Sequence, residues 1–216
     1  MSKLELYTYF RSSCSYRVRI ALAYKAIPYD SVFINLLKGE QQLCEYKDKN
    51  PQGFLPSLAT EDGVLTQSLA IMEYLDEKYP DTKSLLPSSL TDKTIVRSMA
   101  YVIACDIQPI QNLKVLKYLK GNLGLSDDVK VEWIRNFIET GFEALENMIQ
   151  PYSKKFCFQD FFSLADICLI PQVFNAKRFG VDMTKYPTIN KVHENCINLP
   201  FVVDSKPESQ RDCIDS

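Results

Sequence analysis

The sequence predicts an α/β domain followed by an all-α domain, because strand patterns are confined to the first part of the chain. Residues 1–83 alternate between short stretches typical of half-buried strands and stretches with helical spacing of apolar residues. Residues 84–90 contain proline and several serines, which is typical of a linker. Residues 91–216 show only helical patterns.

The first domain is expected to have the element order β-α-β-α-β-β-α. The segment Leu4–Tyr9 alternates like a strand, and Cys14–Lys25 has apolar residues at helical spacing. Ser12 or Ser13 can cap this helix. The other expected elements are a strand at 29–35, a partly helical stretch at 38–50, short strands at 55–59 and 64–65 joined by a turn, and a helix at 68–79. We therefore expect a small mixed sheet with helices on its faces.

The second domain contains three long helical patterns. Asp92–Leu119 is expected to form a helix kinked at Pro109, and Asp127–Ile149 a second helix. A third is expected at 163–176, because Ser163 and Asp166 have the spacing of a capping box ahead of an apolar run. These helices predict an all-α domain for residues 91–216.

Composition and charge exclude several function classes. The formal net charge is -2 and there is no basic block, which argues against binding nucleic acid or anionic lipid. No apolar run approaches the ~20 residues of a membrane-spanning helix. The seven widely spaced cysteines lack a Cys-x-x-Cys motif, which indicates a reducing compartment, the cytoplasm, and no zinc ribbon. His193 is the single histidine, so no histidine-based metal site is expected.

The start of the first predicted helix is a candidate site for a sulfur anion. A helix N-terminus presents unpaired N–H groups and the positive end of the helix dipole, which favour a thiolate placed there. The hydroxyls of Ser12, Ser13 and Ser15 can donate hydrogen bonds to the same sulfur. Two alternatives stay open: the serines can be ordinary helix caps, and Cys14 can be a small buried apolar residue.

Two further positions of the sequence indicate which other groups the ligand should have. Leu55-Pro56 predicts an open sheet edge that can pair with an extended peptide, because proline cannot donate to the ladder. Gln67-Ser68 opens another helix, whose N-terminus can hold a carboxylate, although simple capping is an equal alternative. The three positions together predict a receptor for a short peptide with a central thiol and a carboxylate to one side. Glutathione has this chemistry.

Motifs along nearly the whole chain resemble the zeta class of the glutathione transferase family. The Ser-Ser-Cys signature of that class is matched by Ser12-Ser13-Cys14-Ser15-Tyr16-Arg17-Val18-Arg19-Ile20-Ala21-Leu22. Further matches are Asn50–Gly53, Gln67–Ile71, Ile107–Leu113, Ala165–Val173 and Tyr186–Ile189. The resemblance implies a thioredoxin-like first domain and a helical second domain that forms the substrate pocket. Tyr16 departs from the pattern, because many zeta members have tryptophan there, and this concerns the shape of the pocket.

The resemblance also implies a role for each matching residue. Ser13 would stabilise the glutathione thiolate, while Ser12 and Cys14 shape the same pocket and Cys14 assists without acting as the nucleophile. The residues implied to lie near glutathione or the substrate are Gln42, Leu55, Pro56 in a cis peptide bond, Gln67, Ser68, Gln108 and Asn112. The candidates for the substrate's carboxylates are Arg11 and Arg178, since arginine binds carboxylates bidentately.

The implied activity is glutathione-dependent cis–trans isomerisation of maleylacetoacetate to fumarylacetoacetate, in tyrosine and phenylalanine catabolism. Addition of a thiolate to the cis double bond, rotation and elimination would regenerate glutathione, and the family suggests a homodimer that takes this small dicarboxylate. One alternative is another glutathione reaction, namely conjugation, dehalogenation of α-halo acids or maleylpyruvate isomerisation. Another is a non-catalytic binding protein with the same fold. A glutaredoxin-type redox role is disfavoured, because no Cys-x-x-Cys opens the first helix.

Overall fold

The computed structural model describes residues 4–215 and falls into two units. The first unit comprises the described residues up to Leu85 together with those from Asn198 onward, and the second comprises Leu86–Ile197. The sequence predicts that residues 91–216 as a whole form the helical domain. The structure instead groups the described residues from Asn198 onward with the first unit.

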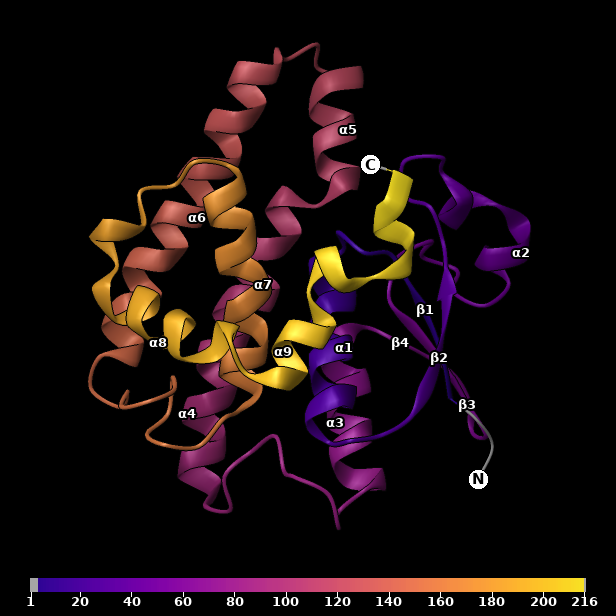
Figure 1. Ribbon diagram of the computed structural model, residues 1–216. Helices are drawn as coiled ribbons and strands as arrows, with labels where there is room; N and C mark the ends of the chain where they lie inside the picture. Colours follow the sequence, from indigo (N-terminus) through magenta and orange to yellow (C-terminus); the bar gives the residue numbers. More distant parts are fainter. Residues whose placement is uncertain (1–3, 216) are drawn as a thin grey trace. The chain divides into compact units, whose positions relative to one another are not determined.

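The first unit is built on a four-stranded mixed sheet in the order β2-β1-β3-β4. The strands are β1 (Leu4–Thr8), β2 (Tyr29–Phe33), β3 (Ser57–Thr60) and β4 (Gly63–Thr66). β1 pairs in parallel with β2 and antiparallel with β3, which forms a hairpin with β4. The helices are α1 (Ser13–Tyr24), α2 (Cys44–Lys47) and α3 (Ser68–Lys78). α1 and α3 pack against each other on one side of the strands, and α2 lies on the other side (Figure 1).

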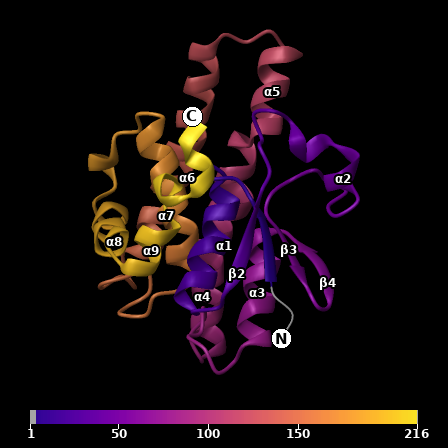
Figure 2. The same ribbon diagram turned by 45° about the vertical axis from the view of Figure 1, so that its right-hand side comes forward.

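The C-terminal segment packs along α1 (Figure 2). It consists of α9 (Pro200–Ser205) and the short 3-10 turns η5 (Pro207–Ser209) and η6 (Arg211–Asp215). Arg19, which is fully buried in α1, donates from Nε to the carbonyl oxygen of Ser205 over 3.1 Å. Because this contact joins residues 186 positions apart, the local pattern of the sequence could not predict it.

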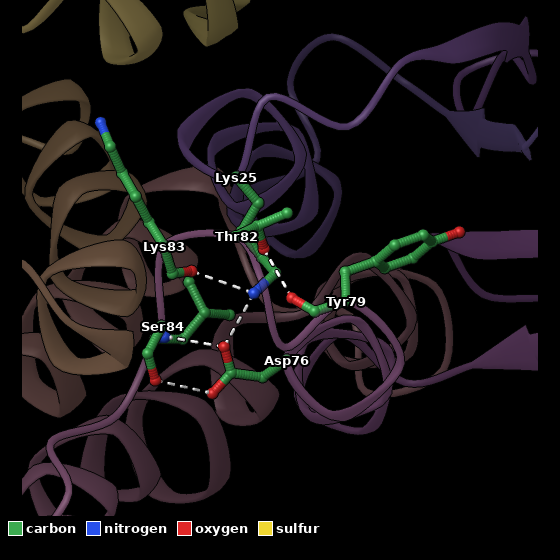
Figure 3. Close-up of polar contacts among 7 residues, drawn as sticks. Lys25, Asp76, Tyr79, Thr82, Lys83 and Ser84 are labelled. Carbon is green, nitrogen blue, oxygen red and sulfur yellow. Dashed lines mark hydrogen bonds and ion pairs between the residues drawn. The ribbon is translucent and has the colours of Figure 1, made fainter.

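A buried ion pair fixes the point where the chain leaves the first unit (Figure 3). The Nζ of Lys25, at the end of α1, donates to Asp76 Oδ1 and to the carbonyl oxygen of Lys83, both over 2.9 Å. The same carboxylate of α3 accepts from the amide of Leu85 over 2.9 Å and from the hydroxyl of Ser84 over 3.2 Å. The side chain of Lys25 is 0% exposed and that of Asp76 15% exposed, so the pair is shielded from water.

The second unit is all-helical. Its helices are α4 (Leu90–Tyr101), the π-helix η2 (Val102–Ile107), η3 (Gln108–Gln111), α5 (Leu113–Gly121), α6 (Asp127–Ile149), α7 (Leu164–Arg178), η4 (Met183–Lys185) and α8 (Pro187–Ile197). The predicted helix at 92–119 is therefore interrupted: a π-helical turn and a 3-10 turn separate α4 from α5. The prediction of a helix at 127–149 is confirmed.

Two local features of this unit, the π-helix and the start of α7, each depend on a single residue. Gly141 in α6 gives the π-helix room, because a Cβ there would lie 2.3 Å from Ile107 Cγ1. The capping box of α7 is confirmed: Asp166 Oδ2 accepts from the amide of Ser163 over 2.8 Å, and its Oδ1 accepts from the amide of Cys157 over 2.8 Å. Burial raises the pKa of Asp166, and these hydrogen bonds oppose the shift. None of the helices in the described residues is long and apolar enough to span a bilayer.

Candidate functional site

The register of the sheet gathers the three candidate positions of the first unit at one end. Ser57, the first residue of β3, pairs with Tyr7 near the end of β1 and with Thr66 at the end of β4. The chain therefore leaves β1 toward α1, enters β3 from the Leu55-Pro56 segment and leaves β4 toward α3 at this same end of the sheet. Side chains and amides at the start of α1 and α3 thus lie near the segment before β3.

At the start of α1, two neighbouring serines have different roles. Ser12 is the helix cap, since its Oγ accepts from the amide of Ser15 over 3.2 Å. Ser13 is the first helical residue, is half-buried, and forms no side-chain hydrogen bond with any residue between 4 and 215. The hydroxyl of Ser15 is completely buried. The capping alternative therefore holds for Ser12, while the hydroxyl of Ser13 is available to a ligand.

Cys14 and Arg17 connect this helix start to the next one. The thiol of Cys14 is free and half-buried. The guanidinium Nη1 of Arg17 lies 3.9 Å from Cys14 Sγ and 3.4 Å from the Oγ of Ser68 in α3. Arg17 belongs to the Ser-Ser-Cys motif, but the resemblance implied no role for it.

The segment before β3 is held by side-chain hydrogen bonds to Phe54, while the backbone N–H and C=O of Leu55 remain available to a ligand. The Leu55-Pro56 peptide bond is cis, as expected. Tyr46 donates from its hydroxyl to the carbonyl oxygen of Phe54 over 2.6 Å, and Asn50 donates from Nδ2 to the same oxygen over 2.8 Å. Leu55 precedes the ladder, and its N–H and C=O bond to no other group in the described part of the chain. Both are free to pair with an extended peptide.

The N-terminus of α3, like Leu55, has backbone groups that remain available to a ligand. Gln67 precedes the helix with a φ of 68°, a conformation that non-glycine residues rarely adopt, and no side chain caps the helix. Its Nε2 donates to Gln52 Oε1 over 2.7 Å, so Gln52, which had no assigned role, orients Gln67. Ser68 is the first helical residue and is 6% exposed. Uncapped amides at a helix N-terminus are suited to a carboxylate.

The two remaining candidates of the first unit make contacts within it. Gln42, at the end of η1 (Glu40–Gln42), donates from Nε2 to the carbonyl oxygen of Gly53 over 3.2 Å. Arg11 is half-buried, with its Cζ 5.1 Å from the ring centroid of Phe10, and donates to the Tyr9 hydroxyl over 3.3 Å. Tyr16, the departure from the motif, is only 2% exposed, so it packs inside the unit.

Three candidates belong to the second unit. Gln108 is the first residue of η3 and is half-buried. Asn112 caps α5, with its Oδ1 accepting from the amide of Lys114 over 3.0 Å. Arg178 lies exposed in the last turn of α7, with its Cζ 5.2 Å from the ring centroid of Phe179.

No group of three or more His, Cys, Asp or Glu side chains that could hold a metal ion occurs within residues 4–213, for which side chains are described.

Comparison with known proteins identifies the family. Residues 2–77 match the family model described as the glutathione S-transferase N-terminal domain. The chain is 45% identical over 213 residues to a maleylacetoacetate isomerase of Dictyostelium discoideum, covering 98% of this chain and 96% of that protein. Its structure is similar to that of a bacterial maleyl pyruvate isomerase of the zeta class, with 39% identity, a TM-score of 0.94 and coverage of 96% and 99% of the two chains. The chain belongs to the zeta class of glutathione transferases.

A second solved structure of this class bears on the site. The maleylacetoacetate isomerase of Anaeromyxobacter dehalogenans, with glutathione bound in its active site, has 38% identity to this zeta-class chain, a TM-score of 0.88 and coverage of 98% of both chains. The predicted fold, a thioredoxin-like N-terminal domain with a helical region, is confirmed. The unused groups of this chain fit glutathione: a hydroxyl at Ser13, backbone groups at Leu55 and an uncapped helix at Ser68.

Proposed function

We propose that this zeta-class chain is an enzyme that binds glutathione at this end of the sheet and isomerises maleylacetoacetate to fumarylacetoacetate. The observation that carries the proposal is the available hydroxyl of Ser13 at the first residue of α1, next to Ser12, which already caps the helix. The name of the Dictyostelium relative, which aligns over nearly the whole chain, supports this choice of reaction.

Each unused group of the first unit would hold one part of the cofactor. Ser13 would donate to the sulfur, with Ser12 and Cys14 shaping the surroundings, and the backbone of Leu55 beside Pro56 would pair with the cysteinyl residue. Gln67, Ser68 and the amides of α3 would hold the γ-glutamyl group, and Gln42 would lie near the cofactor. Bound glutathione would supply a thiolate that adds reversibly to the activated double bond. A helix N-terminus stabilises such an anion through its dipole and its free amides.

The dicarboxylate substrate needs cationic and donor groups. We propose Arg11 and Arg178 for its carboxylates, because a guanidinium donates two parallel hydrogen bonds to a carboxylate. Gln108 and Asn112 are proposed to lie near glutathione or the substrate. Negative charge that develops next to the reacting double bond would be stabilised by such donors, each worth about 2.7–4 kcal/mol in sites of this kind.

The cellular setting belongs to the same proposal. None of the seven cysteines, all of which lie in the described residues, forms a disulfide, which is consistent with a reducing compartment, and we propose a cytoplasmic homodimer acting in tyrosine and phenylalanine catabolism. Light scattering at micromolar concentration tests the dimer, which is refuted by a monomeric mass.

The decisive experiment is a direct isomerase assay with and without glutathione. We expect isomerisation of maleylacetoacetate only in the presence of glutathione, with no net consumption of it. Maleylpyruvate isomerisation is the second candidate, because a structure with a TM-score of 0.94 carries that name. Parallel assays with maleylpyruvate, an α-halo acid and a chloronitrobenzene rank the reactions by kcat/KM. Glutathione binding without turnover of any of them would show a non-catalytic binding protein instead.

A further inference from the structure

Two buried arginines of α1, two positions apart, have different surroundings. Arg17 is 1% exposed and Arg19 is 0% exposed. Arg19 is satisfied by four oxygens, which it reaches over 3.0–3.3 Å: Ser205 O, Thr8 Oγ1, Tyr9 O and Phe10 O. Arg17 uses only Nη1, and its Nε and Nη2 have no hydrogen-bond partner among the described residues. No carboxylate of the described chain pairs with Arg17.

A buried charge without a counter-charge is unfavourable. The cost of removing a guanidinium from water is normally offset by a carboxylate or by several oxygens, as it is for Arg19. At Arg17 this compensation is missing in the protein alone. Its side chain also lies where positive potential is already high, because Nη1 reaches residues in the first turns of both α1 and α3.

The surrounding helix ends contain no anion of their own. Acidic residues often occupy the first turn of a helix, where they stabilise it, but neither α1 nor α3 has one there. The start of α3 also lacks a side-chain cap. Two positive helix ends and an uncompensated guanidinium therefore converge at Ser68, which indicates that the anion comes from a ligand.

We infer that Arg17 is a positioning residue for the cofactor: acting through the hydroxyl of Ser68, it matches the α-carboxylate of the γ-glutamyl residue. This inference rests on the proposed function. The carboxylate is favoured over the thiolate because Nη1 contacts Ser68, the first residue of α3, whose uncapped amides suit a carboxylate, whereas the sulfur is proposed to lie at the start of α1. In the proposed function, the hydroxyl of Ser13 and the amides of α1 stabilise the sulfur, so the thiolate does not require Arg17.

The inference predicts opposite effects on stability and on binding. Arg17→Gln and Arg17→Met should leave the melting temperature of the ligand-free protein unchanged or raise it, because they remove an unpaired buried charge. The same variants should raise the Kd for glutathione, measured by calorimetry, about tenfold. Arg17→Lys, which keeps the charge, should recover part of the affinity. Arg19→Gln is the matched control and should lower the melting temperature, because Arg19 holds four protein oxygens.

Two glutathione analogues separate the carboxylate from the thiolate. The affinity loss of Arg17→Gln should persist with S-methylglutathione, which has no thiol. It should disappear with 4-aminobutyryl-cysteinylglycine, which lacks the α-carboxylate. A double-mutant cycle with Ser68→Ala should show non-additive losses, because both residues act on one group.

Several results would overturn the inference. Loss of the effect with S-methylglutathione would assign Arg17 to the thiolate. A lower melting temperature of ligand-free Arg17→Met, comparable to that of Arg19→Gln, would assign it a structural role. Unchanged binding of glutathione by the Arg17 variants would remove Arg17 from the site while leaving the proposed function intact. If the unmodified protein itself does not bind glutathione, the proposed function fails, and this inference fails with it.

Discussion

The carboxylate of Asp212 accepts a hydrogen bond from the backbone amide of Phe10, with 2.9 Å between Oδ2 and the nitrogen, although 202 positions separate the two residues. The carbonyl oxygen of Phe10 accepts in turn from Nη2 of Arg19 over 3.0 Å. Both polar backbone groups of Phe10 are thus held from outside the β1–α1 turn. Ser12 and Ser13 follow directly in the chain, so the C-terminal segment stabilises the turn that places them.

Asp212→Ala is expected to loosen this turn. Loss of a charged acceptor should lower the free energy of unfolding by about 1–2 kcal/mol, since the carboxylate is only partly buried. Amide hydrogen exchange at Phe10 should become faster, and the Kd for glutathione should rise severalfold. Asp212→Asn keeps an acceptor oxygen and serves as the control. Unchanged exchange at Phe10 in Asp212→Ala would show that the C-terminal segment does not hold the turn.

Lys25→Met is expected to destabilise the first unit strongly. The substitution leaves Asp76 partly buried without its cation, and breaking a buried pair costs about 3 kcal/mol or more. Chemical denaturation at low and high salt checks this, and the loss should depend only weakly on salt because the side chain of Lys25 is 0% exposed. The control is Lys78→Met in the ion pairs with Glu61 and Asp62, where Lys78 is 37% exposed and each acid 52% exposed. That variant should leave the denaturation midpoint unchanged, and equal losses in the two variants would contradict the role of burial.

Gly141→Ala is expected to disturb the π-helix. The added Cβ would overlap with the side chain of Ile107, with 2.3 Å to its Cγ1, and such overpacking costs about 1–3 kcal/mol. Gly121→Ala at the end of α5 is a matched control, because a Cβ there meets no atom within 4 Å. The free energy of unfolding should fall only for Gly141→Ala. Combining Gly141→Ala with Ile107→Ala should cost less than the sum of the two single changes, and strict additivity would argue against the overlap.

The periodicity of the sequence was enough for the sheet and most helices, but not for the π-helix. The spacing of Val96, Met99, Ile103 and Ile107 is that of one face of a continuous helix, and all four are buried. The widened turn at Val102–Ile107 keeps the same residues buried, so the pattern does not distinguish it from a continuous α-helix. It depends on Gly141, which lies in another helix and cannot be matched to Ile107 from sequence alone.

Residue type also could not predict which of two like residues in the site has which role. Ser12 and Ser13 are equally good caps, and only the backbone of the β1–α1 turn decides that Ser12 accepts from the amide of Ser15. Arg17 and Arg19 are likewise of the same residue type and belong to the same motif, so residue type alone does not predict that their surroundings differ. Positions two apart on a helix do not share a face, and here one arginine meets protein carbonyls while the other reaches Ser68.

The two serines give a paired prediction. Ser12→Ala removes the cap of α1 and should lower the free energy of unfolding by about 1 kcal/mol. Ser13→Ala removes no hydrogen bond of the protein alone and should change stability by less than about 0.5 kcal/mol, yet lower the isomerisation rate about 10²-fold. Denaturation and direct rate assays on both variants check this. The assignment fails if Ser12→Ala loses the rate and Ser13→Ala loses the stability.

The most direct measurement is the ionisation of bound glutathione, followed by the ultraviolet absorbance of its thiolate as a function of pH. The thiol is predicted to ionise at a lower pH when bound to the unmodified protein than when free in solution, because Ser13 and the amides of α1 stabilise the anion. In Ser13→Ala, this ionisation should shift back toward that of the free peptide. Equal titration curves for free and bound glutathione, or no change in Ser13→Ala, would contradict the account.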